Sequence, residues 1–237
     1  MTSDLASTAA DIALLDNPIW NSLATRHAKF SVGGSLARRY RPEIGPLSAL
    51  REVSSEALAE LAAIVPADDV AVLFLQERID FPAGWQIVRD GTLVQMVCAA
   101  VSDIPELEQR ILPLGPEDFA EMVALATLTE PGPFRDQTAT LGGFVGVRIQ
   151  GRLAAMAGQR LSPSGFTEVS AVCTHPDFRG RGLARALVAA VARNIFAAGD
   201  VPFLTSFAGN AGAIRVYEQV GFAIRRRFEL AVVKPPV

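Results

Sequence analysis

The alternation of hydrophobic and polar residues predicts a regular series of elements in the C-terminal half of the chain. Short apolar or alternating runs predict strands at 108–112, 144–150, 153–160, 166–174, 202–207 and 222–233. Apolar residues at helical spacing predict helices from about residue 116, over 182–198 and over 210–220. In chain order these elements read β-α-β-β-β-α-β-α-β, with a two-residue hairpin connection at Gly151-Arg152.

The N-terminal part shows a less regular pattern, and we expect residues 17–65 to be mostly helical. One helix is predicted to begin at Ser54 and to end before Pro66. Short apolar runs then predict strands at 70–75, 85–88 and 92–97.

Turn residues at 102–108 predict a boundary between two domains. We therefore expect a smaller N-terminal α/β region at 1–104, to which no role is assigned, and a second domain at 105–237.

The composition is that of an ordinary globular protein, with 50% hydrophobic and 20% charged residues in a chain of 237. No cationic N-terminal stretch precedes an apolar one, and no apolar run reaches the length of a membrane span, so we expect neither secretion nor membrane insertion. Cys98 and Cys173 lie too far apart for a metal or redox motif. We therefore expect a cytoplasmic protein whose two thiols are reduced and packed in the interior.

Charge is distributed unevenly along the chain. Residues 1–110 carry 9 basic and 15 acidic side chains, whereas residues 111–237 carry 13 basic and 10 acidic ones. The overall net charge of −3 argues against bulk nucleic-acid binding, while a mildly basic C-terminal half suits a small polyanion. Only two histidines are present, which excludes a metal site made of several histidines, and no metal is expected.

The most informative segment runs from Val172 to Ala184 and reads VCTHPDFRGRGLA, a strand end, a glycine-rich turn and the start of a helix. Glycines let several backbone N–H groups point one way, because no Cβ obstructs a ligand. The first N–H groups of a helix lack internal partners, and the helix dipole adds partial positive charge there. The turn therefore predicts a pyrophosphate site, beside which Arg179 and Arg181 are either cationic contacts or solvated surface residues.

Three classes of ligand site use such a turn. A Walker A loop needs a lysine, which is missing here. A dinucleotide fold needs a third glycine, but Arg185 occupies that place, and Asp200 precedes the next strand instead of ending it.

The third class fits two separate motifs. Arg179 to Ala184 match the pattern Q/R-x-x-G-x-G/A of the GNAT superfamily of acyl-CoA-dependent N-acetyltransferases. Asn210 to Phe222, which begin 28 residues after Gly182, resemble the later GNAT segment N-x-x-A-x-x-x-Y-x-x-x-G-F at every position. The resemblance covers roughly residues 108–237.

This resemblance implies a mixed α+β fold, in which a central mixed sheet with two splayed parallel strands is flanked by helices. It also implies direct transfer of an acetyl group from acetyl-CoA to an amine, without a covalent enzyme intermediate. The pantetheine amides would pair with backbone groups of the strand at 170–174, with Val172 and Thr174 as the expected partners. The pyrophosphate would bind the backbone N–H groups of Arg179, Gly180, Arg181, Gly182, Leu183 and Ala184.

Tyr217 is the candidate acid that protonates the departing thiolate, because the family motif has a tyrosine there. A packed core tyrosine is the alternative. Asn210 is expected to contact the cofactor, to act as the N-cap of its helix, or to do both.

Glu168 is the candidate base that takes a proton from the attacking ammonium, although an outward-facing strand glutamate is as compatible with the pattern. His175 is interpreted as structural. Cys173 lies near the expected thioester path, and we interpret it as a packing residue in preference to an acyl-carrying nucleophile.

Two functions follow from the resemblance. The first is N-acetylation of a small-molecule, amino-acid or peptide amine, and the second is a catalytically degenerate sensor of acyl-CoA. Transfer of longer acyl chains, a homodimer and the identity of the acceptor are left open, and neither a nucleic acid nor a membrane is expected as a partner. Residues 131–133 and Arg135 are candidate acceptor contacts, with Arg135 placed to bind a carboxylate.

Overall fold

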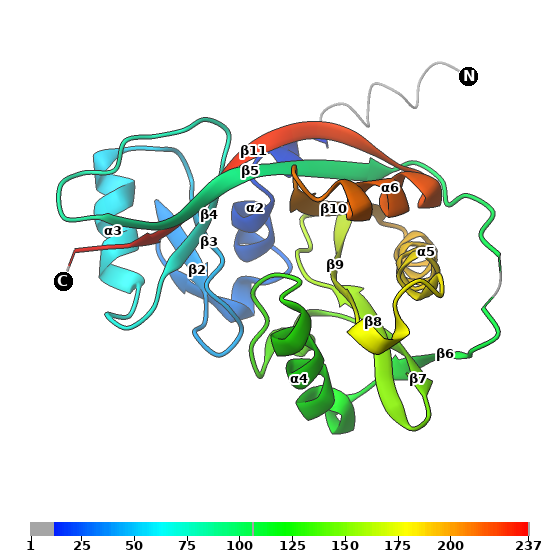
Figure 1. Cartoon of the computed structure of the whole chain (residues 1–237). Coiled ribbons are helices and arrows are strands. Elements are labelled where there is room, and N and C mark those ends of the chain that lie inside the picture. Colours follow the sequence, from blue (N-terminus) through cyan, green and yellow to red (C-terminus); the bar gives the residue numbers. More distant parts are fainter. Residues whose placement is uncertain (1–11, 106, 237) are drawn as a thin grey trace, which may run out of the picture. The chain divides into compact units, whose positions relative to one another are not determined.

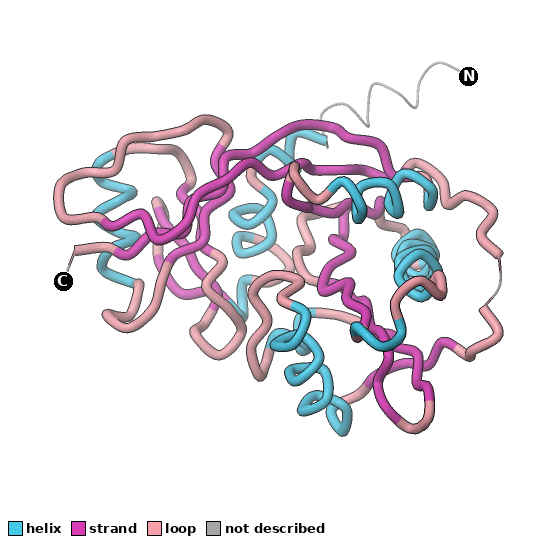
Figure 2. Tube along the Cα trace, viewed as in Figure 1, coloured by secondary structure: helices cyan, strands magenta, loops and turns pink. Residues whose placement is uncertain are grey.

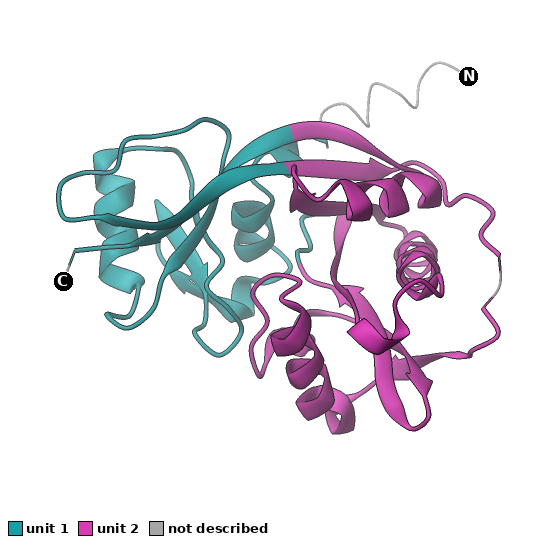
Figure 3. Cartoon of the chain, viewed as in Figure 1, with its two compact units in different colours: residues 1–93, 161–165, 227–237 teal, residues 94–160, 166–226 magenta. Residues whose placement is uncertain are grey.

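The computed structural model describes residues 12–105 and 107–236. The chain forms two compact units (Figure 3). The first comprises residues 1–93, 161–165 and 227–237, and the second comprises residues 94–160 and 166–226. The division differs from a single cut at residue 104, because the chain passes between the units several times.

The second unit is built on a mixed sheet with the strand order β11-β5-β10-β9-β8-β7-β6 (Figures 1 and 2). Its strands are β5 (Gln86–Cys98), β6 (Ile111–Leu114), β7 (Phe144–Ile149), β8 (Arg152–Gln159), β9 (Phe166–Thr174), β10 (Val201–Phe207) and β11 (Phe222–Lys234). Neighbouring strands from β6 to β9 are antiparallel, whereas β9 and β10 are parallel.

Three helices cover this sheet: α4 (Phe119–Thr129), α5 (Leu183–Ala197) and α6 (Ala211–Val220). One apolar cluster joins Leu187 of α5 to Val169 of β9, and we call this side of the sheet the α5 face. A separate cluster joins Met122 of α4 to Cys173 of β9, and we call that side the α4 face. The predicted order β-α-β-β-β-α-β-α-β is confirmed, because periodicity and turn signals are strong in this half of the chain.

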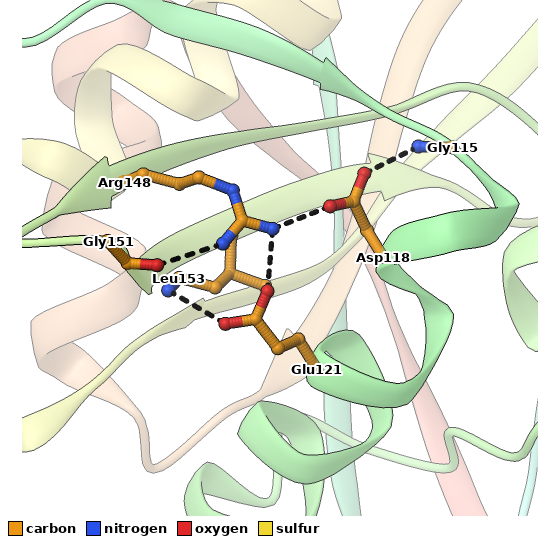
Figure 4. A network of polar contacts seen from close by, with 6 residues as sticks. All are labelled: Gly115, Asp118, Glu121, Arg148, Gly151 and Leu153. Carbon is orange, nitrogen blue, oxygen red and sulfur yellow. Dashed lines mark hydrogen bonds and ion pairs between the residues drawn. The ribbon is translucent and has the colours of Figure 1, made fainter.

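The start of α4 is tied to the β7–β8 hairpin by a polar network around Arg148 (Figure 4). The Arg148 guanidinium pairs with Asp118 at 2.5 Å and with Glu121 at 2.6 Å. Asp118 also accepts from the Gly115 N–H at 2.9 Å, and Glu121 accepts from the Leu153 N–H at 3.4 Å. The network fixes the position of α4 along strands β7 and β8.

The first unit contains two helices and six strand segments among the described residues, one of which is the first part of β5, up to residue 93. Its other elements are α2 (Pro18–Ala24), β1 (Ser31–Gly33), β2 (Ala37–Tyr40), β3 (Ser48–Leu50), α3 (Ser55–Ile64), β4 (Ala71–Leu75) and the last part of β11. Strands β1 to β3 form an antiparallel sheet. Glu60 of α3 accepts from the N–H groups of Gly34, Leu36 and Ala37 at 2.9–3.3 Å, which anchors the helix on the hairpin.

Several boundary predictions are corrected by the structure. The mostly helical prediction for residues 17–65 is wrong, because three strands of only three or four residues carry too little alternation to be recognised. Residues 86–98 form one strand instead of two. The hairpin turn lies at Gln150 and Gly151, whose φ angles are +54° and +78°, one residue before the predicted connection.

Short 3₁₀ segments complete the fold at Ala13–Asp16, Ala28–Phe30, Pro116–Asp118, Thr138–Leu141 and Pro176–Phe178. Within the described ranges, every helix is too short or too polar to cross a membrane.

Candidate active site

A gap opens between the two parallel strands of the second unit. Strands β9 and β10 are paired only at Phe166–Glu168 opposite Val201–Phe203. Both continue, β9 to Thr174 and β10 to Phe207, and no further pairing between them follows in these described strands. Because each strand edge beyond the pairing has unused backbone groups, the gap can accept a ligand that carries its own amides.

A bulge in β9 lies at the mouth of this gap. Its register with β8 shifts between Met156 and Gly158, and Ala171 takes φ +51°, an unfavourable value for a residue with a Cβ. As a result, Ser170 and Ala171 both line a cavity on the α4 face, whereas Val169 and Val172 pack toward the α5 face. The bulge therefore changes which side chains face which side of the sheet.

Backbone groups of β9 after the bulge point into the gap. The His175 N–H donates to the Ala154 carbonyl of β8 at 2.8 Å. Because N–H and C=O groups of successive strand residues point in opposite directions, those of Thr174 and Val172 point away from β8 and toward β10. This is the geometry that the predicted pantetheine contacts require.

Two buried hydroxyls flank the gap without partners. Thr174 Oγ1 and Thr205 Oγ1 are enclosed, and neither has a hydrogen-bond partner among the described residues. By alternation along the strands, Thr174 lies with Val172 on the α5 face and Thr205 lies opposite Leu204 on the α4 face. A buried hydroxyl without a partner is costly, so both positions favour a polar ligand in the gap. Sequence reasoning missed Thr205.

The glycine turn after β9 has the conformation expected of an anion site. Gly180 and Gly182 take φ +76° and +75°, values that favour glycine. The first helical hydrogen bond of α5 runs from the Ala186 N–H to the Gly182 carbonyl at 3.2 Å. The N–H groups from Gly180 to Arg185 therefore lack backbone partners among the described residues, and no acidic residue lies in the first turn of α5. The Arg179 N–H instead donates to the Pro176 carbonyl at 3.3 Å, which corrects its predicted role as a backbone donor to the pyrophosphate.

A hollow of about 380 Å³ lies over this turn. Its lining contains every residue predicted for the pyrophosphate site, together with Thr174: Thr174, Phe178, Arg179, Gly180, Arg181, Gly182, Leu183, Ala184, Arg185, Val216 and Gln219. Val172 and Asn210 are not in the lining. Arg185 and Gln219 were not foreseen, because they depend on how α5 packs on α6.

The hollow is cationic. Arg181 stacks over the ring of Phe178 with its guanidinium carbon 5.4 Å from the ring centre, and Arg185 donates to Gln219 at 3.5 Å. Within the described part of the chain, no carboxylate pairs with Arg179, Arg181 or Arg185. Three uncompensated guanidinium groups beside unused N–H groups form a site for a polyanion.

Tyr217 and Asn210 lie on α6, as the sequence predicts. Tyr217 packs against the α5-face core, and burial raises its pKa to about 12. Its hydroxyl has no hydrogen bond to any described residue, and its side chain is not part of the hollow lining. Asn210 accepts from the Ala213 N–H at 3.1 Å, which confirms it as the N-cap of α6. The catalytic role of Tyr217 and the cofactor contact of Asn210 stay predictions.

Glu168 is fully buried and paired with Arg160 of the segment after β8. The Arg160 Nε and Nη2 atoms donate to the two carboxylate oxygens of Glu168 at 2.8 and 3.0 Å. The outward-facing alternative for Glu168 is therefore excluded, while its role as a base stays a prediction. Arg160 was missed by sequence reasoning, because only the β8–β9 register brings it to Glu168.

A narrow cavity of about 10 Å³ lies against the bulge on the α4 face. Its lining includes both predicted prolines of the acceptor loop: Pro131, Gly132, Pro133, Phe134, Thr138, Phe144, Arg160, Ser170 and Ala171. The side chain of Arg135 is not in this lining. The Arg135 N–H instead donates to Thr138 Oγ1 at 2.7 Å, which shapes the loop.

His175 and Cys173 contact protein groups. The Nε2 atom of His175 lies 2.8 Å from the Arg152 guanidinium, and the Asp177 N–H donates to Nδ1 at 3.2 Å. Cys173 is buried on the α4 face, and desolvation raises the pKa of its thiol to about 11. A thiol that stays protonated at neutral pH is a poor nucleophile, which favours the packing interpretation.

Comparison with known proteins decides the family. A crystal structure from Novosphingobium aromaticivorans, assigned to the GNAT acetyltransferase family, is 41% identical over 94% of this chain and 99% of its own, with a TM-score of 0.85. The chain belongs to the GNAT family. The profile of the FR47-like protein family also matches residues 144–230.

More distant GNAT structures share the fold. A GCN5-related N-acetyltransferase from Kribbella flavida is 21% identical, covering 90% of this chain and 95% of that one, with a TM-score of 0.56. A GCN5-related N-acetyltransferase-like protein from Streptococcus suis reaches a TM-score of 0.63 at 15% identity, covering 95% and 98%. No curated protein matches the chain. The GNAT similarity thus includes the N-terminal residues, which the sequence motifs did not reach.

Proposed function

We propose that this GNAT protein is an acetyl-CoA-dependent N-acetyltransferase that acts on a primary amine of a small molecule, amino acid or peptide. The observation that carries the proposal is the gap between β9 and β10, which leads to a cationic hollow over the glycine turn. Both features lie along the path that a pantetheine arm and its pyrophosphate would take.

The residues present fit acetyl-CoA. The unpartnered Thr174 hydroxyl and the gap-facing backbone of Val172 and Thr174 offer hydrogen bonds to the amides of the arm. Unused N–H groups of the turn, with Arg179 and Arg181 nearby, offer donors and charge to the phosphates.

The proposed chemistry needs one base and one acid. Acetyl-CoA supplies its acetyl group as a thioester, whose C–S bond breaks while the C–N bond to the acceptor forms. Glu168 takes the proton of the attacking ammonium, directly or through water. Tyr217 gives its proton to the departing sulfur and takes up the second proton, which the nitrogen loses as the amide forms. The proton on Glu168 passes to solvent, so that the acceptor leaves as an amide and CoA as a thiol. Because burial raises the pKa of Tyr217 to about 12, the phenol holds its proton at neutral pH.

The experiment is to mix the protein with acetyl-CoA and a panel of amines, and to follow CoA thiol with a thiol-reactive dye. The panel contains free lysine, spermidine, tyramine and a short peptide with a free N-terminus. Cys98 and Cys173 are both buried, so the folded protein contributes little thiol signal of its own. Thiol release that depends on the amine supports the proposal.

The acyl-CoA sensor is the competing outcome. Tight CoA binding with no turnover over the whole panel would favour it and overturn the enzymatic role. Propionyl-CoA and a longer acyl-CoA, tested beside acetyl-CoA, decide the accepted chain length. A cytoplasmic setting belongs to the same proposal, since acetyl-CoA and most amine metabolites are available there.

A further inference from the structure

We propose that Arg160 is a positioning residue for the transfer reaction, fixing the orientation of the Glu168 carboxylate behind the wall of the cavity on the α4 face. The inference rests on the proposed function and adds to it a residue that neither the GNAT motifs nor the sequence pattern indicates.

The two residues are joined at three points. The Arg160 Nε donates to Glu168 Oε2 at 2.8 Å, and Nη2 donates to Oε1 at 3.0 Å. The Arg160 backbone N–H also donates to the Glu168 carbonyl at 3.1 Å. This arrangement leaves the carboxylate little freedom to rotate, because a guanidinium fork matches a carboxylate in one plane.

Burial makes the guanidinium the main support of the carboxylate. The Glu168 side chain has no exposed surface and that of Arg160 is 10% exposed, so water solvates the carboxylate poorly. A buried charge without a partner is costly, so loss of the guanidinium would disturb the position of the carboxylate. Arg160 supplies the compensating charge.

The pairing leaves room for a further proton donor. Two carboxylate oxygens offer about four lone-pair positions, of which Arg160 uses two. No other side chain of the described residues donates to the Glu168 carboxylate. The remaining positions suit the amine of an acceptor or a water molecule between them.

Arg160 also connects Glu168 to the cavity on the α4 face. Arg160 and Ser170 both line this cavity, and Ser170 lies two residues after Glu168 on the same face of β9 before the bulge. Arg160 therefore lies at the cavity wall, and the Glu168 carboxylate lies directly behind it.

The test is a double-mutant cycle measured as kcat, with acetyl-CoA and the fastest amine of the panel as substrates. Glu168→Gln is expected to lower kcat by about 10²–10⁴-fold, the usual contribution of a general base. Arg160→Met is expected to lower kcat at least about tenfold, while the Kd of CoA changes by less than about twofold, because the cofactor hollow is untouched. In the Glu168→Gln background, Arg160→Met should change kcat by less than about threefold, since the two residues act as one unit.

Two further variants keep the inference testable if Arg160→Met folds poorly. Arg160→Lys keeps the charge with a single donor group and should give a kcat between those of the unaltered protein and Arg160→Met. The double variant removes both charges together, which proteins tolerate better than one unpaired buried charge. Arg148→Met is the matched control, because it removes an ion-paired arginine of the same unit that lies outside the candidate site. It should keep the full kcat.

The outcomes separate the two proposals. Lack of transfer by the unaltered protein would overturn the proposed function, and the inference with it. Full activity of Glu168→Gln would overturn the base role and the inference but leave the acetyltransferase. An unchanged kcat in Arg160→Met would overturn the inference alone. So would losses in the two single variants that multiply in the double variant, because they would show that the residues act independently.

Discussion

At the scale of single residues, a glycine of the turn and a glycine outside it distinguish the cost of backbone strain from the loss of a ligand contact. Gly180 takes φ +76° and Gly199 takes φ +85°, and a Cβ at either position would meet no atom within 4 Å. Either glycine changed to alanine should therefore cost about 1–2 kcal/mol of stability through backbone conformation alone.

Only Gly180 lines the hollow, so Gly180→Ala should also weaken CoA binding, whereas Gly199→Ala should leave it unchanged. Thermal denaturation and CoA titration of both variants check this prediction. Equal CoA affinity in the two variants would show that the turn is not part of the CoA-binding site.

Tyr217 gives a second prediction at this scale. Tyr217→Phe should lower kcat by about 10²–10⁴-fold and leave the Kd of CoA unchanged, since the hydroxyl acts on the departing sulfur and not on the cofactor's phosphates. In the unaltered protein, burial raises the pKa of Tyr217 to about 12, so the rate should not decline around pH 10, where an exposed tyrosine ionises. A pH–rate profile and the variant's kinetics check both parts. Full activity of Tyr217→Phe would exclude the acid role.

Residue identities near the turn were predictable because the chemistry is local in sequence. Arg179 to Ala184 adjoin one another, and all of them line the hollow. Arg160 and Thr205 could not be foreseen in the same way. Their positions depend on strand register and on the point where β9 and β10 separate, which no local pattern encodes.

At the scale of elements, the Arg148 network makes the attachment of α4 sensitive to pH. Hydrogen bonds from the Gly115 N–H and then Arg148 lower the pKa of Asp118, and the hydrogen bond from Arg148 lowers that of Glu121. Both carboxyls have lower pKa values in the folded than in the unfolded state. Their stabilising effect is therefore present above the ordinary values of 3.8 and 4.5 and is lost as the pH falls through the lowered ones.

Arg148→Met should accordingly lower the melting temperature at pH 7, and the difference from the unaltered protein should shrink below about pH 4. Melting curves over a pH series measure it. A difference that stays constant with pH would mean that the arginine acts through packing of its side chain alone.

The elements themselves were predicted well where periodicity is long. Helix α5, with apolar residues four apart, and strand β9 agree with their predicted ranges to within a residue. The three short strands β1 to β3 were missed. They are held by pairing with one another, and such pairing leaves no pattern within a single strand. Strand β5 was divided in two because the polar residues and glycine at 89–91 interrupt its apolar pattern.

At the scale of the whole molecule, strand β5 decides which fragments can fold. Its residues after 93 belong to the second unit, where β5 lies between β11 and β10. A fragment of residues 105–237, which the sequence pattern suggests as a domain, lacks this internal strand.

We expect that fragment to fail to fold, because two strands would each lose a hydrogen-bonded neighbour inside the sheet. Circular dichroism and thermal melting of the fragment, beside the full chain, check the prediction. A cooperative melt of the fragment would contradict it and would restore the boundary at residue 104.

The bulge at Ala171 makes the length of β9 more important than most of its side chains. One extra residue there directs Ser170 to one side of the sheet and Val172 to the other. A substitution in this stretch changes single contacts. Removal of one residue would instead turn every following side chain, up to the glycine turn, to the opposite face of the sheet. Among homologues and in designed libraries, the number of residues from 168 to 180 should therefore stay constant even where side chains outside the candidate site differ.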